Sequence, residues 1–340
     1  MTAQRAPLSG NRWHFSHGPI DLVIGADGEP AAVRAAHEAA WARFATVLQE
    51  LVGELPALRA PLLPAAIEDG QAGSRCPLRG PVARQMWAAC LPFADEFITA
   101  MAAVAGAVAD EIVASYRRPG IARAWVNNGG DIALHLAEGN SARVGLFADL
   151  ARLAPLSGIV PGRGAPLGLD GRFEIGAAMP VRGIATSGWR GRSFSLGIAD
   201  SVTVLAGTAA QADAAATMVA NAVDVDDPRI VRRAASELRD DTDLGDRLVV
   251  VDVPTLGRTA VAHALHAGVR RARDLHGRGL LRAAVLVCQG QAAVVGEPGA
   301  RPDAAASGAV AGGRVDTAAG QSAPPVRSRA GAAAAAPGFA

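Results

Sequence analysis

Lysine is absent from the 340 residues, so the 33 strongly basic side chains are all arginines. A lysine that forms a Schiff base with a carbonyl substrate, or the lysine of a P-loop, is therefore excluded. The net charge is only +1 at pH 7, which gives no electrostatic basis for binding nucleic acid or an anionic membrane surface.

Cysteine and long apolar runs are also scarce. Cys76, Cys90 and Cys288 are far apart and have no CxxC spacing, which is typical of reduced thiols in a cytoplasmic protein rather than of a disulfide framework or a zinc site. The N-terminal residues contain no apolar core of signal-peptide length, and no uninterrupted apolar run is long enough to cross a membrane. We therefore expect a cytoplasmic protein with no membrane partner.

The composition changes near the C-terminal end. Half of all residues are hydrophobic and 19% are charged, which favours a sizeable core in one large domain or two modest ones. We expect an N-terminal arm at 1–17 and the folded domain at 18–298. From 299 to 340 the chain is mainly Ala, Gly, Pro and Ser, a composition that cannot offset the entropy of ordering, so this tail is expected to be disordered.

Apolar periodicity and turn residues predict the elements of the domain. Strands are expected at 20–24, 121–126, 132–136, 143–147, 201–206, 246–253, 281–288 and 291–296, with 143–147 in the same sheet as the two strands before it. Helices are expected at 31–53, 82–116 with an interruption near Pro92, 208–221, 228–238 and 258–276. Paired strands followed by long helices favour an α+β fold over a βαβ repeat.

A candidate cation site lies on the expected helix at 208–221. Asp213 and Thr217 are four residues apart, so their oxygens fall on one face of the helix, one turn from each other. A carboxylate and a hydroxyl near a helix start can complete a site for a hard cation or a phosphate. The pair alone also fits a simpler explanation, in which Asp213 interacts with the helix dipole and Thr217 is solvated.

Two glycine turns could bring the backbone close to a ligand. The first is small and hydroxylated, and consists of Thr186, Ser187 and Gly188. The second separates two expected strands and contains Asn128, Gly129, Gly130 and Asp131. Alone, the second turn predicts an Asn-Gly hairpin. As part of a site, its glycines would offer backbone N–H groups to a phosphate or a ring carbonyl, and Asp131 would receive a sugar hydroxyl.

In combination these motifs resemble the ApbE superfamily. Gly-Gly-Asp-Ile (129–132), Ala-Thr-Ser-Gly (185–188), Ser-Val-Thr-Val (201–204) and Ala-Asp-Ala-Ala-Ala-Thr (212–217) occur in this order in that superfamily. Its members include flavin transferases, which move FMN from FAD onto a protein threonine with a bound magnesium ion. The segments 17–21, 101–110, 193–200 and 243–246 resemble an uncharacterised cytoplasmic branch of it. The similarity covers about 18–296 and implies tandem T-fold-like units, each an antiparallel sheet covered by helices.

The resemblance also implies a ligand and a set of site residues. The ligand would be FAD or a related small nucleotide-like molecule, bound with Mg²⁺, and the activity would be FMN transfer to a protein. Asp213 and Thr217 would hold the cation together with the backbone carbonyl of Ala105. The ligand pocket would be lined by Asn128, Gly129, Gly130, Asp131, Thr186, Ser187 and Gly188.

The chain departs from the flavin transferases at two places. Their histidine-containing segment, which ends in Asp-Pro-x-Thr-Gly, is replaced here by a shorter segment without histidine at 191–200, and Ala105 stands where they usually have lysine. Asp200 is the candidate that could substitute as a catalytic base. Two alternatives stay open: a ligand-binding or carrier protein without catalysis, and an enzyme that uses Asp200 and the acidic loop at 240–246 on another nucleotide-like cofactor. The oligomeric state stays open too, a homodimer included.

Overall fold

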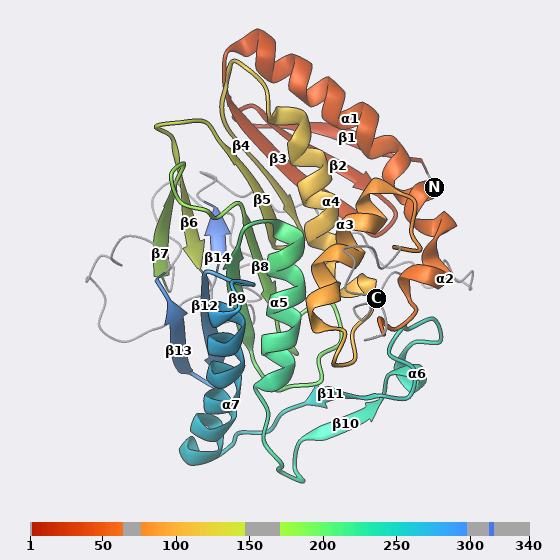
Figure 1. Ribbon diagram of the computed structural model, residues 1–340, viewed down its shortest axis with the longest axis vertical. Coiled ribbons are helices and arrows are strands. Elements are labelled where there is room, and N and C mark those ends of the chain that lie inside the picture. Colours follow the sequence, from red (N-terminus) through yellow and green to blue (C-terminus); the bar gives the residue numbers. More distant parts are fainter. Residues whose placement is uncertain (1, 64–75, 147–170, 298–312, 316–340) are drawn as a thin grey trace.

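The centre of the protein is a nine-stranded antiparallel sheet (Figure 1). The computed structural model describes residues 2–63, 76–146, 171–297 and 313–315, so the tail expected at 299–340 lies outside the described residues except for 313–315. In spatial order the strands are β1 (Gln4–Leu8), β2 (Arg12–His17), β3 (Ile20–Gly28), β4 (Ile121–Asn128), β5 (Asp131–Leu136), β8 (Gly183–Ser187), β9 (Ser201–Ala206), β12 (Ala283–Cys288) and β13 (Gln291–Gly296). The residues expected as an N-terminal arm thus contribute β1 and β2 to one edge of the sheet.

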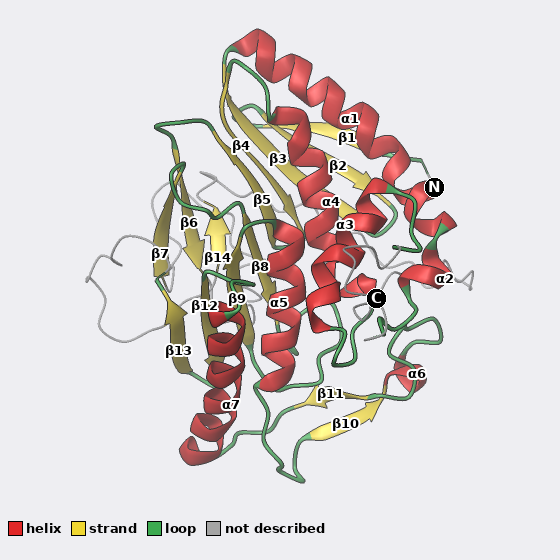
Figure 2. Ribbon diagram, in the orientation of Figure 1, coloured by secondary structure: helices red, strands yellow, loops and turns green. Residues whose placement is uncertain are grey.

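The long helices cover one face of this sheet (Figure 2). They are α1 (Pro30–Gly53), α3 (Pro81–Cys90), α4 (Val104–Val113), α5 (Ala209–Ala222) and α7 (Arg258–Gly277), with a short α2 (Leu55–Leu58) and 3-10 turns η2 (Leu91–Phe93), η3 (Ala100–Ala103) and η4 (Ala114–Tyr116). Proline at the first position starts α1, and its apolar residues at helical spacing, from Val33 to Leu51, are buried. The main core therefore lies between the helices and the sheet.

The opposite face of the sheet contacts a smaller antiparallel sheet of β14 (Gly313–Val315), β6 (Ser141–Leu146) and β7 (Gly171–Gly176). The prediction that 143–147 extends the same sheet as its two predecessors is therefore wrong. Val144 and Ile175 instead share a second hydrophobic cluster with Leu134, Leu205 and Val285 of the main sheet. Burial of this second apolar face explains why the strand leaves the sheet of its neighbours.

The helix expected at 228–238 is also wrong for most of its length. Residues Val231–Ala234 form β10, which pairs with β11 (Leu248–Asp252), and only α6 (Ala235–Leu238) is helical. The residues of β10 alternate between exposed and partly buried, which suits a strand because the period is two. The ion pair between Arg232 and Asp224 (2.6 Å) anchors the strand on one side.

Two successive segments of the chain have the same order of elements. The first contributes β2, β3, the helices α1 to α4, and then β4 and β5; the second contributes β8, β9, the segment α5 to α7, and then β12 and β13. In each, the second and third strands pair directly, and β5 pairs with β8 where the two segments join. The helices α4 and α5 meet above this junction (Figure 1). No helix in the described part of the chain is long and apolar enough to cross a membrane.

Candidate functional site

The first turns of α4 and α5 lie side by side and run in opposite directions. At Gly106, in the first turn of α4, an added Cβ would lie only 2.3 Å from the carbonyl oxygen of Ala209 at the start of α5. Only glycine permits this approach. The N-terminal ends of both helices, where backbone N–H groups lack helical partners, are thereby brought together.

Each helix supplies a carboxylate to the N-terminus of the other. Asp110 in α4 accepts hydrogen bonds from the N–H groups of Ala209 (3.0 Å) and Ala210 (2.8 Å) in α5. Asp213 in α5 accepts one from the N–H of Gly106 (3.0 Å) in α4. A carboxylate at this position satisfies unpaired donors and interacts favourably with the helix dipole. Asp213 therefore caps the neighbouring helix α4, and its effect is not limited to the dipole of its own helix α5.

Asp213 also faces a second carboxylate, that of Asp131 at the start of β5. Asp131 is 8% exposed, and its Oδ1 accepts a hydrogen bond from the N–H of Thr186 (3.1 Å). Burial raises the pKa of Asp131 to about 7, against the lowering influence of the Thr186 N–H and the Arg192 charge. Burial and the charge of Asp131 raise the pKa of Asp213 well above its usual range. We call these two residues the carboxylate pair; near neutral pH it retains a proton.

Further oxygen atoms that could bind a cation lie close to Asp213. Thr217 is one turn from Asp213 on α5, and both residues are partly buried. The carbonyl of Ala105, in the peptide whose N–H at Gly106 donates to Asp213, accepts a hydrogen bond from Asn128 Nδ2 (3.1 Å). Carboxylate, hydroxyl and carbonyl oxygens are the ligands that hard divalent cations prefer. The described residues contain no group of three or more His, Cys, Asp or Glu side chains that could hold a metal, so a cation here would depend on this mixed oxygen set.

The glycine turn at 129–130 differs in detail from its expected role. Both glycines have positive φ angles, +65° and +122°, in the region that favours glycine. The N–H of Gly130 donates to the Asn127 side chain (2.8 Å), so it is not free for a ligand. Instead, the guanidinium of Arg192 lies over the turn, with Nη2 2.2 Å from where a Cβ of Gly129 would be.

Arg192 is the site residue that the sequence reasoning missed. It is exposed, and its charge acts on Asp131 by lowering the pKa of that carboxyl. It belongs to the segment 191–200 that replaces the histidine-containing segment of the flavin transferases. An arginine in that replacement, in a chain with no lysine, is the signal that could have pointed to it.

The residues of the other expected turn, Thr186 to Gly188, contribute mainly through the backbone. The Thr186 hydroxyl lies 2.9 Å from that of Thr203, its cross-strand partner on β9. Val202 and Val204 belong to the core under the helices, so Thr203 points to the opposite face of the sheet. Thr186 therefore reaches the carboxylate pair through its N–H and not its hydroxyl. Gly188 has a positive φ of +158° and lies where a Cβ would be 2.6 Å from the Asp200 carbonyl.

Asp200, the expected catalytic base, is held at the start of β9. Its Oδ1 lies 3.1 Å from Arg190 Nε, and its Oδ2 accepts a hydrogen bond from the N–H of Gln289 in the β12–β13 turn. The carboxylate is thus engaged by a cation and a backbone donor, and its role as a base stays a prediction.

The acidic loop at 240–246 is fixed by polar contacts, two of them to the helical layer. Asp241 pairs with Arg59 (3.0 Å), Asp243 accepts a hydrogen bond from the Thr99 hydroxyl, and Asp246 accepts one from Ser236 (2.6 Å). The pKa of the buried Cys90 thiol is raised by burial and by the charges of Asp213 and Asp243. Asp243 and Asp213 therefore both contribute negative potential at the Cys90 thiol.

These observations define an α+β protein in which one face of a large antiparallel sheet is covered by helices, and a central helix carries a carboxylate and a hydroxyl one turn apart. The family described as AbpE bacteria matches residues 4–294, and the chain belongs to this family.

Three relatives illustrate how far the similarity extends. A UPF0280 protein of Methanopyrus kandleri is 38% identical over 172 residues, which is 50% of this chain and 61% of that protein. A UPF0280 protein of Methanospirillum hungatei is 37% identical over 139 residues, 41% of this chain and 50% of that protein. One of Methanosarcina acetivorans is 31% identical over 223 residues, 65% and 75% of the two chains. The matched region thus spans between half and three-fifths of the length of the first two relatives.

Proposed function

We propose that this protein binds Mg²⁺ together with a flavin nucleotide, FAD, at the junction of α4, α5 and β5. The observation that carries the proposal is the carboxylate pair. Two like charges held together and partly desolvated raise each other's pKa, and such an arrangement lowers stability unless a cation or proton compensates it. A divalent cation with ligands from Asp213, Thr217, Asp131 and the Ala105 carbonyl would provide that compensation.

Arg192 supports a phosphate-bearing ligand. A guanidinium binds phosphate oxygens through paired N–H donors, and Arg192 lies over the glycine turn at 129–130, close enough to Asp131 to lower its pKa. A diphosphate between the cation and Arg192 would contact positive charge on both sides. The repeated order of elements is in keeping with tandem T-fold-like units, and the resemblance to flavin transferases selects FAD among diphosphate ligands.

In FMN transfer, an acceptor hydroxyl would attack the FMN phosphorus, AMP would leave, and a base would take the hydroxyl proton. The cation would neutralise the charge that develops on the diphosphate, and Asp200 is the base in this scheme. A second function, ligand binding without transfer, is favoured by one observation: Asp200 is engaged by Arg190 and the Gln289 N–H.

Thermal unfolding with and without Mg²⁺ and FAD tests the binding proposal. A ligand at about 100 times its Kd stabilises the native state by about 2.7 kcal/mol, which raises the melting temperature measurably. We expect an FAD shift that depends on Mg²⁺ in the wild type and in the control variant Asp274→Asn, which alters an exposed carboxylate on α7. Asp213→Asn should abolish it.

The same samples separate the two functions. Incubation with Mg²⁺, FAD and a threonine-containing acceptor protein, followed by mass spectrometry, should give the mass gain of FMN if transfer occurs. Binding without any mass gain would favour the carrier function, and the absence of an FAD shift would refute both.

A further inference from the structure

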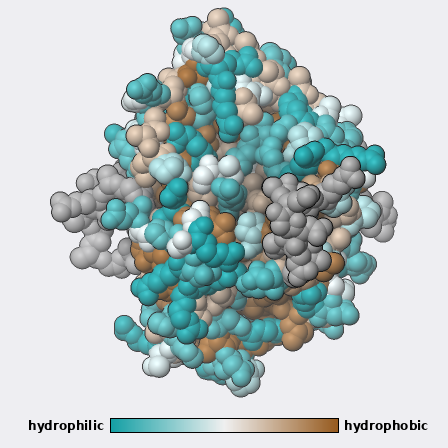
Figure 3. All heavy atoms as spheres, viewed as in Figure 1, coloured by the Kyte–Doolittle hydropathy of each residue, from teal (hydrophilic) through white to brown (hydrophobic). Residues whose placement is uncertain are grey.

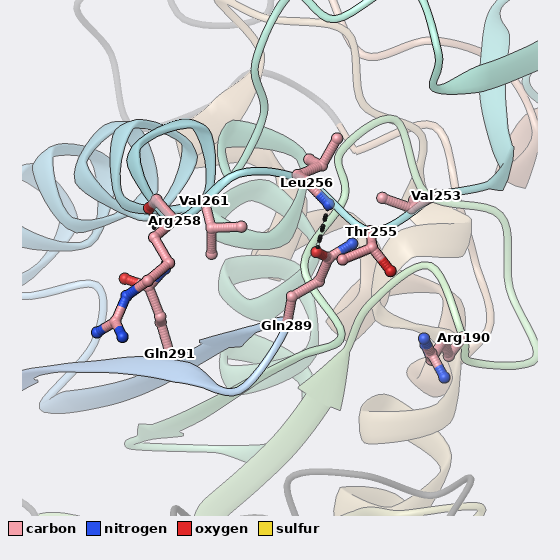
Figure 4. A pocket seen from close by; sticks show the side chains of 8 residues that line it. All are labelled: Arg190, Val253, Thr255, Leu256, Arg258, Val261, Gln289 and Gln291. Carbon is pink, nitrogen blue, oxygen red and sulfur yellow. Dashed lines mark hydrogen bonds between the residues drawn. The ribbon is translucent and has the colours of Figure 1, made fainter.

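A cavity lies between the start of α7 and the β12–β13 turn. Its volume is about 400 Å³, within the range of small-molecule sites. Two arginines line it, Arg190 from the segment after β8 and Arg258 from the first turn of α7. Figure 4 shows them on opposite sides of Gln289. The cavity therefore carries positive charge towards both of its ends.

The positive charge in this cavity is only partly compensated. Arg190 pairs through Nε with Asp200 (3.1 Å) and lies over the Trp189 ring, with its side chain still 39% exposed. Arg258 forms no ion pair with any described residue. It also stands in the first turn of α7, which has no acidic residue and no capping side chain. A cation at a helix N-terminus is unfavourable, because that end of the dipole is itself positive.

The wall of the cavity is fixed by two glutamines. Gln289 has a positive φ of 43°, and its side chain accepts a hydrogen bond from the Leu256 N–H (2.9 Å, dashed in Figure 4) and donates one to the Pro254 carbonyl (2.7 Å). Gln291 donates to the Arg258 carbonyl (3.0 Å). The loop before α7 is thus tied to the β12–β13 turn, so a ligand would meet a preformed surface with little ordering left to do.

The space between the arginines has an apolar side. Val253, Leu256 and Val261 line it, and only a small part of each is open to the cavity, since they are 8%, 6% and 2% exposed. An inorganic anion would leave this surface without a partner, whereas a short carbon chain would cover it. We propose that the cavity binds a small organic dianion, in which a carbon chain contacts the three apolar side chains and two terminal anionic groups pair with Arg190 and Arg258.

This site is separate from the carboxylate pair and does not depend on the proposed flavin function. The cavity has arginines and no lining carboxylate, so it selects anions, whereas the carboxylate pair selects a cation. Asp213→Asn should therefore leave organic-dianion binding unchanged. That result distinguishes failure of one proposal from failure of the other.

Calorimetric titration of the full chain with matched probes tests the inference. We expect saturable binding of at least one member of the series malonate, succinate, glutarate and adipate. Butyrate has one anionic group and should bind at least about tenfold more weakly, as expected when one charged hydrogen-bonded pair is lost. Sulfate, which has no carbon chain, should also bind more weakly than the best dicarboxylate. Sulfate binding as tightly as the best dicarboxylate would overturn the organic assignment.

Arg258→Gln is the decisive variant, because Arg190→Gln would also remove the cation beside Asp200. It should weaken the best dicarboxylate by about tenfold. The control Arg273→Gln removes an exposed arginine of α7 that does not line the cavity, and it should bind as the wild type does. Equal binding by the two variants, or no saturable binding of any dicarboxylate to the wild type, would refute the site.

Discussion

Asp110 and Asp213 perform the same local task in two different surroundings. Each lies on one of the paired helices and accepts hydrogen bonds from the N-terminal N–H groups of the other. Asp110 is 7% exposed and is compensated by two N–H donors and by the charge of Arg117, so that only burial raises its pKa. Asp213 is likewise stabilised by the backbone N–H groups of Gly106 and Ala105, but it faces Asp131 in addition, whose charge raises its pKa further.

This difference separates a carboxylate that only caps a helix from one that we propose to belong to the binding site. The surroundings of Asp110 satisfy its charge, whereas those of Asp213 add a second negative charge that folding alone does not require. Unfavourable pairs of this kind are concentrated where a ligand or a proton compensates them. Four measurements test whether Asp110 and Asp213 differ in this way.

The largest expected effect is on stability at Asp110. Asp110→Ala removes the acceptor of two buried N–H groups, and should lower the free energy of unfolding by roughly 2–4 kcal/mol from the lost cap and the unsatisfied donors. Urea unfolding monitored by circular dichroism measures it. A loss below about 1 kcal/mol would mean that water or the Thr208 hydroxyl replaces the carboxylate, and that Asp110 is not the structural member.

At Asp213 the effect should be on cation binding, with little loss of stability. Asp213→Asn keeps an oxygen that can accept the Gly106 N–H and removes the repulsion from Asp131, so the cation-free variant should be at least as stable as the wild type. Its Mg²⁺ affinity should fall on the order of 100-fold or more, at the upper end of what supporting residues of metal sites contribute. Titration calorimetry with Mg²⁺ alone measures it, and an unchanged affinity would contradict the site.

The third effect is a pH dependence of the stability, which should come from Asp131. Its folded pKa of about 7 lies above the unfolded value, so the protonated form is favoured by folding. That contribution to stability is complete below about pH 4, where the unfolded carboxyl is also protonated, and is lost as the pH rises through about 7.

Conversely, Mg²⁺ must displace the proton, so its affinity should rise with pH up to about 7 and then level off. Mg²⁺ titrations between pH 5.5 and 8.5 test this dependence, and Asp131→Asn should flatten it while also weakening binding. A wild-type affinity independent of pH would show that the pair holds no proton.

The smallest effect is expected at Arg192. Arg192→Gln should weaken FAD binding by about tenfold, the loss of one charged hydrogen-bonded contact, and Arg192→Lys should recover only part of it because the bidentate geometry is lost. Mg²⁺ binding in the absence of nucleotide should stay close to the wild type in both variants. A variant that loses Mg²⁺ and FAD to the same extent would assign Arg192 to the folding of the glycine turn.

The sequence was informative where a pattern repeats at short range. The helices at 31–53 and 258–276 and the hairpin at 281–296 follow from periodicity and turn residues, and the structure confirms them within a few residues. The α+β class followed as well. The segments 143–147 and 228–238 failed because their partners, β7 and β11, are set by tertiary pairing that short-range spacing does not contain.

For the candidate site, the sequence could predict the proximity of residues on one helix but not of residues on three different elements. The spacing of Asp213 and Thr217 on one helix face was visible in the sequence. The contact of Asp213 with Asp131 depends on how α5 crosses β5, and the position of Arg192 over Gly129 depends on a loop. The side of the sheet to which Thr186 points depends on the register of β8 and β9, which a turn motif alone does not determine.

The exchange of carboxylates between α4 and α5 has a consequence for how the chain can be divided. A fragment ending near residue 137 would keep Asp110 without the N–H groups it serves and would leave the first turn of α4 without Asp213. A fragment beginning near residue 182 would keep Asp213 without the N–H group it accepts from, and would leave the first turn of α5 without Asp110. Each fragment should therefore be poorly folded alone, and the two should regain structure when mixed, because each carries the cap that the other lacks.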